Sequence, residues 1–215
     1  METALAKEIL GNNFIGINEL NLIHLKMNLL SPLKIINKIP EIPFTKDLLN
    51  KCKETHFLFL AIPFFSDHSK VTINTLKAQF GVDPSISEPC FYNQDWYEKE
   101  VFANITFRLG WYLMSHKIID NTRGLGLEAI KEQQHIITNV PSAVLSVYSF
   151  FLYYYHTGNN FLFKHDYIWN SDTDINGDRI YIGKYFDPLA INKNGIEIHR
   201  HLSIKSNYGA VSFFS

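Results

Sequence analysis

Residues 161–186 read FLFKHDYIWNSDTDINGDRIYIGKYF, and this stretch decides the fold class. Two strand-like runs, at about 161–170 and 179–186, flank a short acidic turn. A parallel pair of strands needs a connection of about a dozen residues or more, whereas an antiparallel pair accepts a short turn. The stretch therefore predicts an antiparallel hairpin.

The rest of the sheet follows from the same reasoning. The connection from Asp187 to Gly195 is also short, so the next strand should again be antiparallel. Upstream, the apolar run His56–Ile62 ends at Pro63 and indicates a central strand buried on both faces. Further strands are expected at 107–117, 196–205 and 208–214.

Helices are indicated by apolar spacing and by capping residues. Thr45 is placed to cap one helix, and Leu22, Leu25 and Leu29 recur at helical spacing in another. The expected helices are 2–10, 18–30, 46–54, 74–80, 96–104, 128–137 and the apolar segment that Pro141 opens. The pattern predicts an α+β fold, with helices packed on one face of a mostly antiparallel sheet and an N-terminal helical cap.

The length and composition indicate a single domain. A chain of 215 residues that is 46% hydrophobic can bury a sizeable core. The domain is expected to span 1–215, with a possible division into a helical cap at 1–54 and a sheet-containing body at 55–215. Residues 82–95 are rich in proline and serine and are expected to be a mobile lid or a surface excursion.

The N-terminal region predicts a cytoplasmic protein. Met1–Glu8 lacks the basic-then-apolar pattern of a secretion signal. Residues 136–163 are apolar, but Pro141 and Gly158 leave about 16 helical residues where a membrane span needs about 20. A buried central helix is expected there, and no membrane partner.

The charge balance argues against nucleic acid as a partner. Lys and Arg number 20 against 21 Asp and Glu, whereas phosphate binding rests on clustered positive charge. A protein partner or self-association is favoured, because the terminal strand Tyr208–Phe214 could pair with another chain.

The acidic turn concentrates oxygen ligands. Asp172, Asp174, Asn176 and Asp178 stand at alternate positions, and Gly177 permits a sharp bend, as in calcium-binding loops. The glutamate that closes such loops is missing. The alternative is a hairpin in which Asn176 and Gly177 supply the positive φ angles of a primed turn and the aspartates bond to local amides.

Glu197, His199 and His201 alternate along an expected strand and should project from one face of it. Two imidazoles at this spacing can bind zinc, with Glu197 or a residue of a neighbouring strand as a third ligand and water as a fourth. The alternative is a solvated sheet face with no metal.

Arg200 lies between these histidines. Alternation places it on the apolar face of the strand, where a cation needs a partner. Asp166 and Asp187 are the expected partners, unless the strand lies at an edge that lets the guanidinium reach water.

Eight blocks of sequence carry a resemblance to known proteins. They are Asn13–Glu19, Ile42–Phe44, Lys51–His56, Gln94–Tyr97, Gly110–Leu113, Glu132–Gln134, Val140–Pro141 and Ser171–Gly177. In collinear order over nearly the whole chain, they resemble a family of uncharacterised bacterial proteins with no assigned activity. The resemblance implies a complete stand-alone domain and supplies no catalytic residues.

The motifs that mark common enzymes are missing from the sequence. There is no GxSxG motif or phosphate-binding glycine loop, and Cys52 and Cys90, expected to be structural, form no CxxC pattern. An aromatic group could stack a sugar or a base, or fill the core: Phe91, Tyr92, Trp96, Tyr97, Trp111 and Tyr112.

A non-catalytic binding or assembly module is therefore the favoured function. The alternatives are a zinc-dependent hydrolase that uses the C-terminal histidine pair, in which the metal activates a water molecule, and a calcium-stabilised structural domain.

Overall fold

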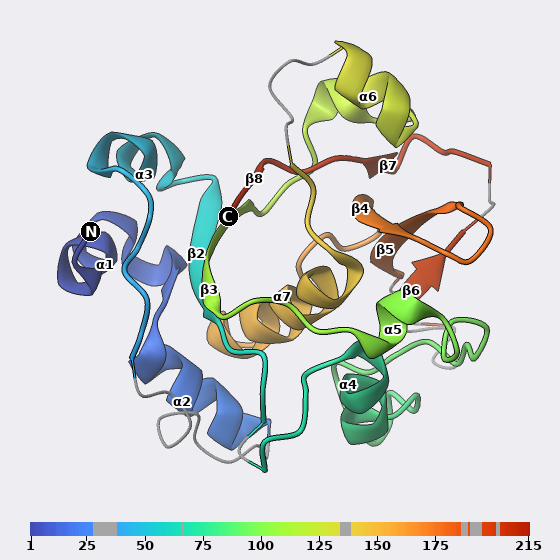
Figure 1. Ribbon diagram of the computed structural model, residues 1–215, viewed down its shortest axis with the longest axis horizontal. Helices are drawn as coiled ribbons and strands as arrows, with labels where there is room; N and C mark the ends of the chain where they lie inside the picture. The colour runs from blue at the N-terminus through green and yellow to red at the C-terminus, as the bar shows by residue number, and fades with distance from the viewer. Residues whose placement is uncertain (28–37, 66, 134–138, 186–188, 190–194, 201–202) are drawn as a thin grey trace.

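The computed structural model of the protein describes residues 1–27, 38–65, 67–133, 139–185, 189, 195–200 and 203–215. Within these residues the chain forms two four-stranded sheets, and helix α7 (Ala143–His156) lies between them (Figure 1). The α+β class and the mostly antiparallel pairing expected from the sequence are confirmed. The strands are divided between two sheets.

The first sheet has the strand order β1-β2-β3-β8. β2 (His56–Ala61) pairs antiparallel with β3 (Gly110–Ser115), β1 (Phe14–Ile15) lies parallel to β2, and β8 (Phe213–Phe214) lies antiparallel to β3. Every residue of β2 is buried. The expected central strand is confirmed, because β2 has a strand on each side and helices over both faces (Figure 1).

The second sheet has the order β6-β5-β4-β7. β4 (Tyr167–Thr173) and β5 (Arg179–Tyr185) form the expected antiparallel hairpin. β6 (Gly195–His199) pairs antiparallel with β5, and β7 (Tyr208–Gly209) lies parallel to β4. The C-terminal third of the chain therefore builds most of this sheet.

Two strand boundaries differ from the sequence prediction. The strand expected at 161–170 begins only at Tyr167, because Phe163 and His165 have φ angles of 50° and 68°, which a strand cannot contain. The strand expected at 208–214 is divided into β7 and β8, which belong to different sheets. Residues 210–212 carry the chain from one sheet to the other.

The N-terminal helical cap is present. It consists of α1 (Thr3–Leu10), the 3-10 turn η1 (Gly11–Asn13), α2 (Ile17–Lys26) and α3 (Lys46–Cys52). The hydroxyl of Thr45 accepts a hydrogen bond from the Leu48 amide at 3.2 Å, so the expected cap of α3 is confirmed. α1 and α3 lie on the side of the first sheet that faces away from α7 (Figure 1), whereas α2 also packs against α7, where Lys26 donates to the Tyr155 carbonyl at 3.2 Å.

Helix α7 joins the two sheets and confirms the expected buried central helix. Its Tyr153 ring meets Phe57 of β2 edge-on at 5.3 Å, and its Ser146 hydroxyl accepts a hydrogen bond from the Asn170 amide of β4 at 2.6 Å. Within the described residues, no helix combines the length and the apolar character that crossing a membrane requires.

Two of the remaining helices pack against α7, one lies beside β7, and one covers the outer face of the second sheet. They are α4 (Ile73–Phe80), α5 (Val101–Asn104), the 3-10 turn η3 (Asp120–Thr122) and α6 (Leu127–Gln133). The helix expected at 96–104 is limited to α5, because Glu100 is extended, with ψ 147°. Leu127 and Ile130 of α6 pack on Tyr167, Trp169 and Tyr181 and close that face.

Residues 90–92 form an additional edge of the second sheet. The Ile196 amide donates to the Cys90 carbonyl at 2.9 Å, and the Tyr92 amide donates to the Ile196 carbonyl at 3.0 Å. Cys90 and Phe91 are fully buried, and Cys52 and Cys90 are buried thiols that form no disulfide bond. The expectation that 82–95 is a simple surface excursion is therefore wrong for this part of it.

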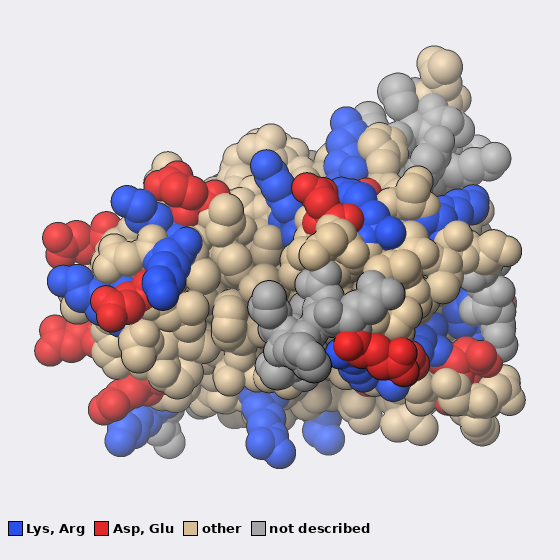
Figure 2. All heavy atoms as spheres, turned by 90° about the horizontal axis from the view of Figure 1, so that it is seen from above, with Lys and Arg blue, Asp and Glu red and all other residues tan. Residues whose placement is uncertain are grey.

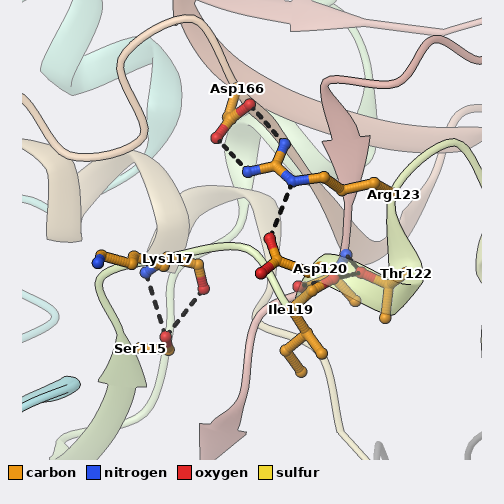
Figure 3. Close-up of polar contacts among 8 residues, drawn as sticks. Ser115, Lys117, Ile119, Asp120, Thr122, Arg123 and Asp166 are labelled. Carbon is orange, nitrogen blue, oxygen red and sulfur yellow. Dashed lines mark hydrogen bonds and ion pairs between the residues drawn. The ribbon is translucent and has the colours of Figure 1, made fainter.

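An ion pair joins the segment after β3, which contains Asp120 and Arg123, to the start of β4 in the second sheet (Figure 3). The Arg123 guanidinium donates two hydrogen bonds to the Asp166 carboxylate, at 2.8 and 2.9 Å, and lies 3.3 Å from Asp120. The hydroxyl of the buried Thr122 accepts from the Ala210 amide at 2.9 Å. Asp166, one of the two partners expected for Arg200, is therefore paired with Arg123.

Candidate functional site

The acidic turn closes the β4–β5 hairpin. The Gly177 amide donates to the Asp174 carbonyl at 3.0 Å, and the Asp174 amide donates to the Asp178 carbonyl at 3.0 Å. Gly177 has a φ of 88°, but Asn176 is not among the described non-glycine residues with positive φ. The expected hairpin is confirmed and the primed turn is wrong; the contacts fit a three-residue loop that ends in a left-handed glycine.

The Asp174 carboxylate organises this turn. Oδ1 accepts hydrogen bonds from the Asn176 and Asp178 amides, each at 2.9 Å, and Oδ2 accepts one from the Arg200 guanidinium. Burial raises the pKa of Asp174, but these hydrogen bonds hold it below its usual value. The carboxylate therefore stays ionised and paired.

Arg200 connects the turn to the segment before α5. Its guanidinium lies 3.6 Å from the Glu100 carboxylate and 4.3 Å from the centre of the Trp96 ring. The partner predicted for it, Asp166, is bound elsewhere, and Asp187 lies outside the described residues. The partner of Arg200 is Asp174, which was not expected. No sequence pattern connects these two residues, because they are 26 positions apart in the chain.

Asp172 points to a different partner. Its Oδ2 accepts a hydrogen bond from the Ala143 amide at 2.6 Å and so caps the start of α7. Burial raises the pKa of Asp172, and the Ala143 amide opposes that shift. A calcium ion in the turn would have to displace the partners of both Asp172 and Asp174. Calcium binding through Asp172, Asp174, Asn176 and Asp178 stays a prediction.

The structure brings Glu197 and His199 together on one face of β6. The His199 Nε2 atom lies 3.0 Å from the Glu197 carboxylate, which also accepts a hydrogen bond from the Tyr167 hydroxyl. Burial and the Glu197 hydrogen bond raise the pKa of Tyr167. The side chains of Glu197 and His199 are only 12% and 19% exposed, so tyrosines cover most of the face predicted to be solvated.

A metal site at this face stays a prediction. His201, the second imidazole of the proposed zinc set, lies outside the described residues. In the part of the chain that the structure describes, no group of three or more His, Cys, Asp or Glu side chains is arranged to hold a metal ion. Zinc binding by Glu197 and His199 would have to replace their mutual hydrogen bond.

A pocket of about 310 Å³ lies beside the N-terminal helical cap. Phe14 of β1 and Trp111 of β3 form one wall, with their rings stacked at 5.5 Å and 29°. The Trp111 indole N–H donates to the Pro40 carbonyl at 2.9 Å, so this ring is fixed in place. Ile17 and Ile39 add further apolar surface.

Two opposite charges lie at the same pocket. The Lys7 ammonium of α1 donates to the Glu19 carboxylate of α2 at 2.6 Å, and the Gly16 amide donates to the other Glu19 oxygen at 3.0 Å. Burial raises the pKa of Glu19, but these hydrogen bonds and the Lys7 charge keep it below its usual value. Glu19 is therefore an ionised carboxylate at pH 7.

Gly16 is required by the shape of this pocket. A Cβ atom at Gly16 would lie 2.5 Å from the Phe14 ring and 3.2 Å from the Glu19 carboxylate. Sequence reasoning missed the pocket, although two of the resembling blocks, Asn13–Glu19 and Gly110–Leu113, meet there. The two blocks form one site only because β1 pairs with β2 and β2 pairs with β3.

A second hollow, of about 580 Å³, lies against α4. Its polar groups bond to one another. The Lys77 ammonium lies 2.8 Å from the Glu98 carboxylate, and the Asn74 side-chain amide donates to the Glu98 carbonyl at 2.8 Å. Among the described residues, no aromatic side chain lines it. On the face of the molecule shown in Figure 2, acidic and basic side chains are interspersed, so this face carries no extended patch of one charge.

No protein-family model, curated protein or solved structure matches this chain.

Proposed function

We propose that this protein is a binding module without catalytic activity, and that its ligand occupies the pocket between α1, α2 and β3. The observation that carries this proposal is the stacked wall of Phe14 and Trp111 beside the Lys7–Glu19 pair. Small-molecule sites are typically hollows of about 300 to 1,000 Å³, mostly apolar, with a few polar groups that fix orientation. The pocket has this composition and lies at the small end of that range.

The polar groups of the pocket favour holding a ligand over reacting with it. A general base works best when its pKa lies near the operating pH. Here burial raises the pKa of Glu19, but the hydrogen bonds from Lys7 and Gly16 hold it below its usual value, which makes this carboxylate a weak base. These groups can orient a charged ligand without transferring a proton to it.

Binding of a neutral aromatic probe tests this proposal. Benzyl alcohol should bind the protein in ligand-observed NMR titrations. Ala4 is exposed on α1 and lines the pocket, so Ala4→Trp should fill the space without altering the core. We expect the affinity for benzyl alcohol to fall about tenfold or more in this variant.

Ala78→Trp is the matched control, because Ala78 is also exposed on a helix but lines the hollow against α4. It should leave the affinity unchanged. Equal binding by the wild type and Ala4→Trp would show that this pocket is not the site, and a selective loss in Ala78→Trp would assign binding to the other hollow.

A protein partner or a second copy of the chain is the second candidate. Leu22 and Leu25 stand one turn apart on α2 and are 62% and 66% exposed, whereas Leu20 and Ile23 of the same helix are buried. Exposed apolar side chains grouped on one surface are typical of interaction sites. They support self-association through the outer face of α2.

Sedimentation velocity over a concentration series tests this candidate. We expect the wild type to form a concentration-dependent oligomer and the double variant Leu22→Ser, Leu25→Ser to associate about tenfold more weakly. Ile175→Ser is the control. Ile175 is 87% exposed and lies in the turn between β4 and β5, which is far from α2 (Figure 1). A wild type that stays monomeric at all concentrations would remove self-association.

A further inference from the structure

We infer that the ligand of the pocket beside α1 and α2 is an amino acid with an aromatic or branched aliphatic side chain, held as a zwitterion by Lys7 and Glu19. This inference rests on the proposed function and names the ligand class for the same site. It depends on the two opposite charges, on their unequal exposure and on the apolar wall beneath them.

The first step is charge complementarity. Lys7 Nζ and Glu19 Oε1 are 2.6 Å apart, so a ligand that reaches one of them also reaches the other. A ligand that carries only a carboxylate would be repelled by Glu19, and one that carries only an ammonium would be repelled by Lys7, because like charges brought together are unfavourable. An α-amino acid carries both groups on one carbon and can pair its carboxylate with Lys7 and its ammonium with Glu19.

The second step is that this ion pair can open for a ligand. The Lys7 side chain is 56% exposed and the Glu19 side chain 15% exposed. Water screens the charge of a side chain as exposed as Lys7, so moving its ammonium from Glu19 into solvent costs little. Glu19 stays in place because the Gly16 amide also binds it, while the flexible Lys7 side chain can shift to admit the ligand.

The third step concerns the side chain of the ligand. Ile17 and Ile39 present carbon atoms to the pocket, and the almost wholly buried rings of Phe14 and Trp111 lie behind them, with the indole N–H of Trp111 already bonded to Pro40. The volume of about 310 Å³ equals that of about ten molecules of liquid water. The space therefore suits one amino acid with an aromatic or branched aliphatic side chain.

Isothermal titration calorimetry with three related compounds tests the inference. L-phenylalanine carries both charges, hydrocinnamate lacks the ammonium and phenethylamine lacks the carboxylate. We expect L-phenylalanine to bind about tenfold or more tightly than either analogue. Similar affinities for all three compounds would overturn the inference.

A charge-neutral variant supplies the second measurement. Lys7→Met with Glu19→Gln keeps the shape of the pair and an acceptor for the Gly16 amide. It should lose the preference for L-phenylalanine and still bind benzyl alcohol. The matched control is Lys131→Met with Glu128→Gln, which removes the exposed ion pairs of Glu128 with Lys131 and Arg179, whose residues do not line the pocket. This control should keep the preference.

The outcomes separate the two proposals. If benzyl alcohol binds but L-phenylalanine does not, or if the neutral variant keeps the preference, the zwitterion inference is wrong and the binding-module proposal stands. If neither compound binds, the binding-module proposal itself is wrong. Should melting curves show that the double variant is unfolded, Lys7→Met alone provides the same test, because Lys7 is exposed.

Discussion

Replacing Glu88 with alanine is expected to lower the free energy of unfolding by about 3 to 5 kcal/mol, because it leaves a buried charge without its partner. The partner is Lys184 of β5, whose side chain is 2% exposed and whose ammonium lies 2.7 Å from Glu88. The ammonium also lies 4.3 Å from the centre of the Phe161 ring. Urea unfolding of the wild type and Glu88→Ala measures the difference.

Two controls separate pairing from the mere loss of a side chain. The double variant Lys184→Met, Glu88→Gln removes both charges and should recover most of the loss, because no buried charge is left unpaired and the position of Glu88 is 27% exposed, so a neutral amide there can reach water. Glu128→Ala removes an exposed carboxylate that also binds cations, and should cost about 1 kcal/mol or less. A loss in Glu88→Ala no larger than in Glu128→Ala would contradict the assignment.

Phe151→Ala is expected to cost about 3 to 5 kcal/mol through loss of buried contacts and creation of a cavity in the core. Phe151 is fully buried on α7. Its ring stacks on Phe80 of α4 at 4.2 Å and lies 5.8 Å from Phe91, so it joins the central helix to two other parts of the core. Urea unfolding measures this loss as well.

Phe64→Ala is the matched control for this variant, because it removes the same atoms from a side chain that is 37% exposed. It should cost clearly less than Phe151→Ala, since less apolar surface returns to water. Equal losses in the two variants would show that Phe151 does not have the packing role assigned to it.

The candidate site could be predicted only in part. Alternation along a strand is a local property, so the sequence predicts that Glu197 and His199 lie on one side of a strand, and the structure brings them within hydrogen-bond distance. No local pattern identifies Tyr167 as their neighbour. Strand β5 separates β6 from β4, and the order of strands in a sheet leaves no trace in the periodicity of any one strand.

The pocket beside α1 and α2 illustrates the same limit. Glu19 and Gly16 follow a local capping pattern, but Trp111 reaches the pocket only because β3 pairs with β2, and β2 with β1. The charge pairs of Arg200 and Lys184 are also long-range contacts, with Asp174 and Glu88. A carboxylate distant in the chain cannot be assigned to a cation from the sequence alone.

By itself the sequence determined the α+β class, the apolar central strand, the β4–β5 hairpin, the Thr45 cap and the buried α7 helix, because apolar runs, turn residues and caps act over a few neighbouring residues. Only the tertiary structure decided that the strands form two sheets, that β7 and β8 separate between them, and that Phe14, Trp111, Lys7 and Glu19 enclose a pocket. Those features depend on which distant segments pack together. That choice is made by the burial of the whole core around α7 and not by any local pattern.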